Sequence, residues 1–163
     1  MIGRRSFLGF AAAVLAAACD KGKAPSSSSS SSAVSTEDDD ALGALMAPAT
    51  LAGRLEEVKA GKVLVLHVGP KVLWKKSRIP GSEWVGEGSS SSGYDAFAAR
   101  LAKVPPEVEV VAYCGCCAVE DCPNVRPASR AIRESKRAKA YLLDLPTNFG
   151  TDWERKGLPV ERG

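Results

Sequence analysis

Three short apolar segments, separated by stretches with helical spacing, constrain the fold of this chain most strongly. They span residues 62–68, 107–113 and 138–145, and Val, Leu and Ala predominate in them. A nearly continuous apolar run of this length is typical of a strand that is buried on both faces. We therefore expect three central strands of a sheet that is covered on both sides.

Segments with helical spacing alternate with these strands. We expect helices over residues 50–59, 94–103, 126–136 and 151–156, and one further short strand over residues 83–85. Strands that alternate with helices favour a parallel sheet, because each crossover helix packs back onto the sheet. The sequence therefore predicts an α/β fold, an open parallel sheet with helices on both faces.

The only histidine and four of the five cysteines follow two of the predicted strands. His67 lies at the end of the first strand, and Cys114, Cys116, Cys117 and Cys122 fall within nine residues after the second. Sites in open parallel sheets form beyond the carboxyl ends of the strands, so these side chains are expected at one edge. Backbone N–H groups where the loop meets the next helix favour a thiolate, which predicts a nucleophilic cysteine.

Charge excludes one class of function. The chain has 22 basic and 19 acidic residues, and two of the basic ones, Arg4 and Arg5, lie in a segment that we expect to be removed. Nucleic-acid binding needs a basic face, and a nearly neutral chain with interspersed signs has none. We therefore expect no nucleic-acid partner.

Residues 1–18 predict an export signal. Arg4 and Arg5 precede an apolar run over residues 7–15, which is too short to span a bilayer comfortably. The paired arginines resemble a twin-arginine signal, and the Ala-Ala-Ala segment before Cys19 resembles a bacterial lipobox. The resemblance implies an exported protein of the periplasm or cell envelope, with a lipid attached to Cys19. A plain cleaved signal peptide is the alternative.

The remainder divides into a linker and one domain. Asp20 resembles the residue that keeps enteric lipoproteins in the inner membrane, which implies anchoring there. Residues 19–46 contain an unbroken serine run and an acidic run, a composition typical of a flexible linker. Residues 47–163 are long enough to bury a core of their own.

Three patches between about residue 50 and residue 163 resemble the rhodanese-like domain family. Residues 78–82 (RIPGS) are similar to the family's turn of His, Ile, Pro, Gly and Ala. Residues 110–114 (VVAYC) resemble the strand that delivers the active-site cysteine, and residues 150–160 resemble the closing pattern of Gly, Trp, Gly and Pro-Val. More narrowly, the CGCC-x4-CPNVRPA loop resembles an exported bacterial subgroup.

The cysteine loop departs from the family pattern. In the family the active-site cysteine opens a six-residue loop that runs into a helix, whereas about twice that length separates Cys114 from Arg126. Either Cys114 is the active cysteine of an expanded loop, or Cys122, four residues before Arg126, takes its place. The first strand ends in His-Val-Gly from His67, where the family has Asp-Val-Arg.

The resemblance implies a sulfurtransferase. A cysteine thiolate takes sulfur from a small anionic donor such as thiosulfate and passes it, as a persulfide, to a thiol acceptor. Cys114 is the expected carrier and Cys122 the alternative. Arg126 stabilises anions, and His67 pairs with the thiolate or protonates a leaving group. The simpler interpretation has His67 bonded to a backbone carbonyl and Arg126 on the helix surface. No cofactor is expected, and the sequence identifies no protein partner.

Four cysteines in nine residues also permit other interpretations. In an oxidising compartment, Cys122 bridged to Cys114 or Cys117 would make a non-catalytic, disulfide-bonded module. A thiol-redox module, in which one cysteine attacks and a neighbour resolves, is a further possibility. Four thiolates also suffice for zinc or an iron–sulfur cluster, but the spacing is not that of a zinc knuckle, so no metal is expected.

Overall fold

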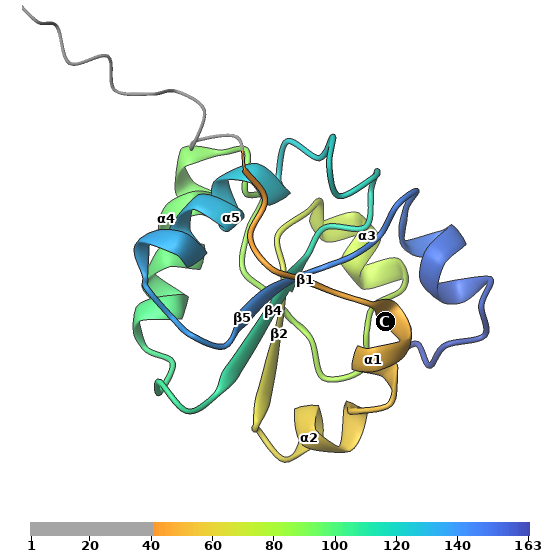
Figure 1. Cartoon of the computed structure of the whole chain (residues 1–163). Coiled ribbons are helices and arrows are strands. Elements are labelled where there is room, and N and C mark those ends of the chain that lie inside the picture. The colour runs from red at the N-terminus through yellow and green to blue at the C-terminus, as the bar shows by residue number, and fades with distance from the viewer. Residues whose placement is uncertain (1–40) are drawn as a thin grey trace, which may run out of the picture. The chain divides into compact units, whose positions relative to one another are not determined.

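A five-stranded, all-parallel sheet forms the centre of the computed structural model, which describes residues 41–163 (Figure 1). The strand order is β1-β5-β4-β2-β3, so β5, β4 and β2 lie inside the sheet. The strands are Leu45–Met46 (β1), Val63–His67 (β2), Glu83–Trp84 (β3), Glu109–Tyr113 (β4) and Ala140–Leu143 (β5). The predicted α/β fold with an open parallel sheet is confirmed.

Helices cover both faces of the sheet. They are Pro48–Ala52 (α1), Leu55–Lys59 (α2), Lys71–Lys76 (α3), Ser91–Ala102 (α4), Val125–Glu134 (α5) and the π-helical turn Gly150–Glu154 (η2). Helices α4 and α5 pack side by side over one face, and α1, α2 and η2 pack against the other (Figure 1). The apolar core is accordingly divided into two clusters, one under each layer.

Alternation along β4 assigns its side chains to the two layers. Val110 and Ala112 pack under α4 and α5, whereas Val111 and Tyr113 pack on the α1 and α2 side. All four are almost completely buried, as the continuous apolar run predicts. Because the alternation continues past the strand, Cys114 joins the cluster under α4 and α5.

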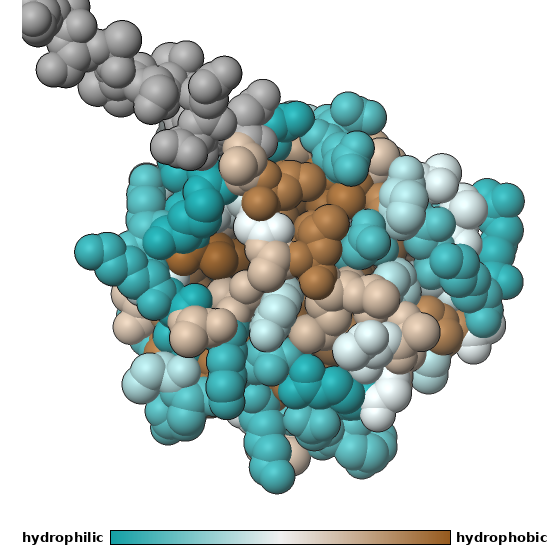
Figure 2. Space-filling view, in the orientation of Figure 1, coloured by the Kyte–Doolittle hydropathy of each residue, from teal (hydrophilic) through white to brown (hydrophobic). Residues whose placement is uncertain are grey.

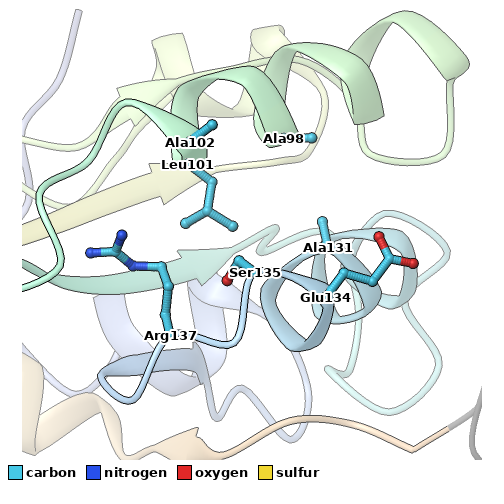
Figure 3. A pocket seen from close by; sticks show the side chains of 7 residues that line it. All are labelled: Ala98, Leu101, Ala102, Ala131, Glu134, Ser135 and Arg137. Carbon is cyan, nitrogen blue, oxygen red and sulfur yellow. The ribbon is translucent and has the colours of Figure 1, made fainter. Parts of the chain in front are cut away.

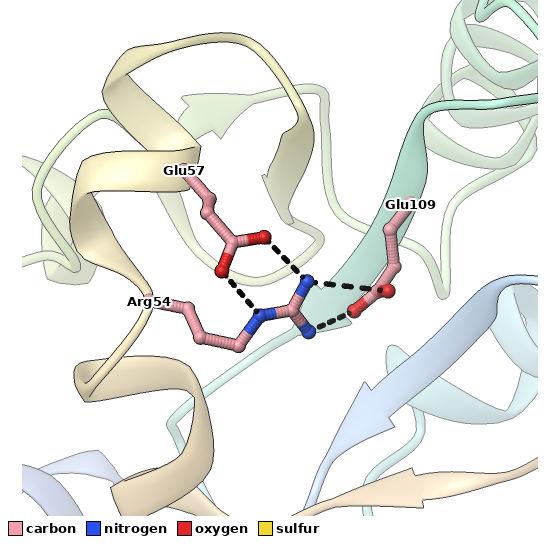
Figure 4. Close-up of polar contacts among 3 residues, drawn as sticks. All are labelled: Arg54, Glu57 and Glu109. Atoms are coloured by element: carbon pink, nitrogen blue, oxygen red, sulfur yellow. Dashed lines mark hydrogen bonds and ion pairs between the residues drawn. The ribbon is translucent and has the colours of Figure 1, made fainter.

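The helix expected over residues 50–59 is broken in two. Gly53 ends α1, and Arg54 adopts φ −117°, outside the helical region, before α2 begins. The Arg54 guanidinium lies 2.9 Å from a Glu57 oxygen and 2.6 Å from a Glu109 oxygen (Figure 4). These ion pairs fasten α2 to the start of β4, a tertiary contact that local spacing does not encode.

The sequence does not predict two elements of the structure, α3 and β1. Helix α3 has no buried residue and exposes Val72, so it lacks the apolar spacing that marks a helix.

Strand β1 lies within residues 41–46, where the sequence predicts a linker, and the folded domain therefore begins before residue 47. Its two residues pair with β5, and Met46 is buried, but so short an edge strand has no alternation to detect. Figure 2 shows hydrophobic surface near the middle of the view, where β1 crosses, and Leu45 is exposed.

Several predictions about the N-terminal part lie outside the described residues. They are the export signal over residues 1–18, lipid attachment at Cys19 and most of the linker over residues 19–46. Within residues 41–163, none of the helices is long and apolar enough to cross a membrane. Export and lipid anchoring therefore stay predictions.

Candidate active site

The carboxyl ends of β2 and β4 bring the histidine and the cysteine loop together. His67 pairs with Tyr113 across the two strands, and Cys114 follows Tyr113 directly. The N–H of Val68 donates to the Tyr113 carbonyl at 2.8 Å, which continues the pairing beyond the strand ends. The two segments that the sequence placed at one edge are thus neighbours there.

The four cysteines of the described part are free thiols gathered around Cys116. The Cys116 sulfur lies 3.1 Å from that of Cys114, 3.2 Å from that of Cys117 and 3.8 Å from that of Cys122. Cys114 and Cys122 are buried, Cys117 is half-buried and Cys116 is exposed. The cluster therefore joins a buried pair of thiols to one that solvent reaches.

Backbone contacts hold the loop in this shape. Gly115 has φ +85°, and a Cβ there would lie 2.8 Å from the Phe149 Cβ, so the position requires glycine. The Gly115 carbonyl accepts from the Phe149 N–H at 3.1 Å, and the Leu145 carbonyl accepts from the Val119 N–H at 2.9 Å. The segment after β5 thereby fastens the cysteine loop at two points.

The start of α5 distinguishes the two buried cysteines electrostatically. The Cys122 sulfur lies directly before α5, within 4.8 Å of the Cys114 sulfur. The neighbouring Cys114 thiol, and to a smaller extent the backbone N–H groups of Asn124 and Val125, lower the pKa of Cys122 to about 5. The proximity of Cys122, together with burial, raises the pKa of the Cys114 thiol. The arrangement therefore supports a thiolate at Cys122 and a neutral thiol at Cys114.

Two residues that the sequence analysis did not select hold Cys114 in place. The Asn124 amide nitrogen lies 3.6 Å from the Cys114 sulfur, while its oxygen accepts from the N–H and the hydroxyl of Ser89. A Cβ on Gly69 would come within 2.5 Å of the same sulfur. The sequence contains a signal for each of them. Gly69 stands where the family has arginine, and Asn124 belongs to the CPNVRPA motif.

His67 is a buried, neutral side chain. Burial lowers its pKa to about 4, even though a hydrogen bond to the Cys114 backbone opposes the shift. Its Nδ1 accepts from the Gly69 N–H at 3.3 Å, and its ring meets Tyr113 edge-on at 4.8 Å. His67 is thus held by a backbone N–H in the turn after β2, where the simpler interpretation expects a backbone carbonyl as its partner. Its role toward a thiolate stays a prediction.

Arg126 lies in the first turn of α5 and reaches back to the cysteine loop. Its guanidinium donates to the Glu120 carbonyl at 2.7 Å, and its backbone N–H donates to the Cys122 carbonyl at 3.3 Å. The side chain thus braces the loop from the helix. Its expected role toward an anion stays a prediction.

A pocket of about 170 Å³ opens at this edge, beside the cysteine cluster. Its lining includes His67, Lys76, Ser77, Tyr113, Cys114, Phe149 and Glu154, and Cys122 is not among the lining residues. The buried Ser77 hydroxyl has no hydrogen-bond partner in the described part of the chain. Lys76 and Ser77, at the end of α3, could donate to a small anion beside Cys114, whereas the Glu154 carboxylate would repel it.

A second hollow, of about 450 Å³, lies between α4 and α5 (Figure 3). The residues that line it are Ala98, Leu101, Ala102, Ala131, Glu134, Ser135 and Arg137. Neither cysteine nor histidine is among them, so this hollow does not contribute to the candidate site.

The thiols also form a set that a soft metal ion could use. The sulfurs of Cys114, Cys116 and Cys122 all lie within 4.8 Å of one another. Thiolates are ligands that zinc and copper(I) favour in proteins. Metal binding is thus a chemical alternative to sulfur transfer at the same atoms.

Comparison with known proteins identifies the fold. No protein-family model and no curated protein sequence matches the chain. Among solved structures, the rhodanese-like domain of an Anabaena protein matches 75% of this chain and 81% of its own length, with a TM-score of 0.52 and 15% identity. This chain has a rhodanese-like fold.

Other solved structures resemble this chain to a similar degree. A Bacillus halodurans protein matches with a TM-score of 0.54 and 16% identity over 73% of this chain and 77% of that one. EanB matches with a TM-score of 0.52 and 17% identity over 73% of this chain, which corresponds to 27% of EanB. EanB has also been solved in complex with hercynine. These likenesses concern the fold alone.

Proposed function

We propose that this protein is a sulfurtransferase that takes sulfur from a small anionic donor such as thiosulfate and carries it as a cysteine persulfide. The observation that carries the proposal is the environment of the Cys122 sulfur. It lies directly before α5 at the carboxyl edge of a rhodanese-like sheet, 3.8 Å from the Cys116 sulfur and within 4.8 Å of the Cys114 sulfur. The Cys114 thiol and the backbone N–H groups of Asn124 and Val125 lower its pKa. Of the two candidate carriers, we therefore assign the reactive thiolate to Cys122.

The reaction follows from these groups. The Cys122 thiolate attacks the outer sulfur of thiosulfate, the S–S bond of the donor breaks, and sulfite leaves with the electron pair. The new persulfide is anionic, and the backbone N–H groups of Asn124 and Val125, which favour the thiolate of Cys122, would favour this charge as well. Attack by a thiol acceptor on the outer sulfur then removes it from the enzyme.

Peptide mass spectrometry of the full chain tests the proposal. The reduced protein, freed of reductant and exposed briefly to thiosulfate, should carry the mass of one added sulfur or its reaction product within the cysteine loop. Cys122→Ser should abolish uptake, whereas Cys114→Ser retains a hydroxyl donor and should still react. Persulfide on Cys114 in the Cys122→Ser protein would move the carrier to Cys114. A wild-type protein in which thiosulfate changes no cysteine would overturn the sulfurtransferase.

We also propose that the domain acts outside the inner membrane, anchored through a lipid on Cys19. The support is the N-terminal sequence alone, with its paired arginines, short apolar run and lipobox-like segment. Cell fractionation should find the full-length protein with membranes, and Cys19→Ser should release it. A Cys19→Ser protein that fractionates like wild type would contradict the anchor.

A further inference from the structure

The position of Cys116 carries an inference that rests on the proposed function and extends it. Cys116 is the exposed member of the cluster, and its sulfur contacts both buried sulfurs, at 3.1 Å for Cys114 and 3.8 Å for Cys122. We propose that Cys116 is a resolving thiol: it attacks the persulfidated cysteine, releases the transferred sulfur as hydrosulfide and leaves an internal disulfide. The domain is then a reductase of sulfane sulfur as well as a carrier.

The geometry explains why this residue suits the role. Gly115, with φ +85°, turns the chain so that the side chains before and after it meet. A carrier on either buried cysteine therefore has the Cys116 sulfur close to its own sulfur. Cys117 also lies beside Cys116, but a bond between adjacent cysteines would be strained. Because Cys117 is half-buried, a bridge to it would also be less open to an external reductant than one to Cys116.

Atoms and electrons balance within the site. In the first step, thiosulfate and the Cys122 thiolate give sulfite and the Cys122 persulfide anion. In the second, the Cys116 sulfur attacks the inner sulfur of Cys122, forming one S–S bond while the bond to the outer sulfur breaks. The outer sulfur leaves as hydrosulfide with the proton of the Cys116 thiol. The two thiols supply the two electrons that reduce the sulfane sulfur, and both end in the disulfide.

A second turnover requires a reductant from outside the domain. The Cys116–Cys122 disulfide has one exposed partner, which a dithiol, small or protein-borne, can attack. The leaving thiolate is then Cys122, which the start of α5 stabilises. The chemistry thus identifies the partner class as a thiol–disulfide reductant, in place of a simple sulfur acceptor.

The test is a single-turnover experiment on the full chain. Reduced protein, desalted under anaerobic conditions, is mixed with one equivalent of thiosulfate, hydrosulfide is measured, and the cysteine peptides are analysed by mass spectrometry. The wild type should release one hydrosulfide per chain and form a disulfide between Cys116 and a buried cysteine. Cys116→Ser should retain the added sulfur and release no hydrosulfide, while the matched control Cys117→Ser should behave like wild type. A second variant, Cys116→Ala, guards against an effect of the new hydroxyl.

The outcomes separate this inference from the proposed function. Hydrosulfide release by Cys116→Ser at the wild-type level, or a disulfide to Cys117 in the wild type, overturns the resolving role of Cys116. A persulfide that persists in the wild type without hydrosulfide also overturns this role but leaves the sulfurtransferase intact. If neither the wild type nor Cys116→Ser reacts with thiosulfate, the proposed function fails, and the inference fails with it.

Discussion

The Cys114 thiol, a hydrogen-bond donor within 4.8 Å of the Cys122 sulfur, should control the pH at which the protein reacts. This neighbour is the largest cause of the lowered pKa of Cys122, which falls from an ordinary 9.0 to about 5. At pH 7 a pKa of about 5 leaves about 99% of the group as thiolate, against about 1% at the ordinary value. The sign is clear: reactivity is present above the lowered pKa and is lost as the pH falls through it.

The gain in rate depends strongly on pH. A thiolate loses nucleophilicity as its pKa falls. With a Brønsted slope of about 0.4–0.5, a fall of about four pKa units lowers the rate constant of the thiolate by about 40- to 100-fold. At pH 7 this loss nearly cancels the roughly 100-fold gain in thiolate. At pH 6 the thiolate gain is roughly 900-fold, so Cys122 should react about tenfold faster than an ordinary cysteine. The lowered pKa of Cys122 therefore extends reactivity toward acid more than it raises the maximum rate.

The assay is iodoacetamide alkylation of Cys122 followed by peptide mass spectrometry between pH 4 and 9. Wild type should reach half its maximal rate near pH 5, as the pKa of Cys122 requires. Cys114→Ala removes the donor and should move the midpoint upward by at least about one unit, while Cys114→Ser keeps a donor and should move it less. A wild-type rate that keeps rising to pH 8 or 9, or an unchanged midpoint in Cys114→Ala, would refute the assignment of the thiolate.

Three further predictions concern the support of the site. Gly69→Ala places a Cβ 2.5 Å from the Cys114 sulfur and should lower the free energy of unfolding, measured with denaturant, by about 1–3 kcal/mol. In the control Gly53→Ala the new Cβ has contacts at 3.5 Å or more, so the free energy of unfolding should change by under about 1 kcal/mol. Tyr113→Phe removes a buried hydroxyl that accepts a backbone N–H at 3.2 Å and should cost about 1–3 kcal/mol by the same measurement; an unchanged midpoint would contradict this. Because burial lowers the pKa of His67 from 6.5 to about 4, the unfolded chain binds a proton in that range before the folded protein does, and stability should fall as the pH drops from about 6.5 to about 4. His67→Gln should remove up to about 3 kcal/mol of that pH dependence, and an unaltered slope would show that His67 is not buried as neutral imidazole.

The central strands, the short strand β3 and the helices α4 and α5 could be predicted from the sequence, whereas β1 and α3 could not. The segments that form β2, β4 and β5 are mostly apolar because both faces of the sheet are covered. Strand β1 has two residues, and α3 buries none of its side chains, so neither has a pattern that local sequence could reveal. The break between α1 and α2 accompanies ion pairs from Arg54 to partners on α2 and β4, and the partner on β4 lies 55 residues away along the chain.

The same division holds in the candidate site. The sequence by itself determined that His67 and Cys114 would lie at one edge, because residues that end parallel strands meet there whatever their side chains. It left open whether Cys114 or Cys122 holds the thiolate and whether His67 is charged. The pKa of each group depends on its burial and on its neighbours, which only the tertiary structure brings together. Such interactions act over a few ångströms between groups that the chain brings together only when it folds.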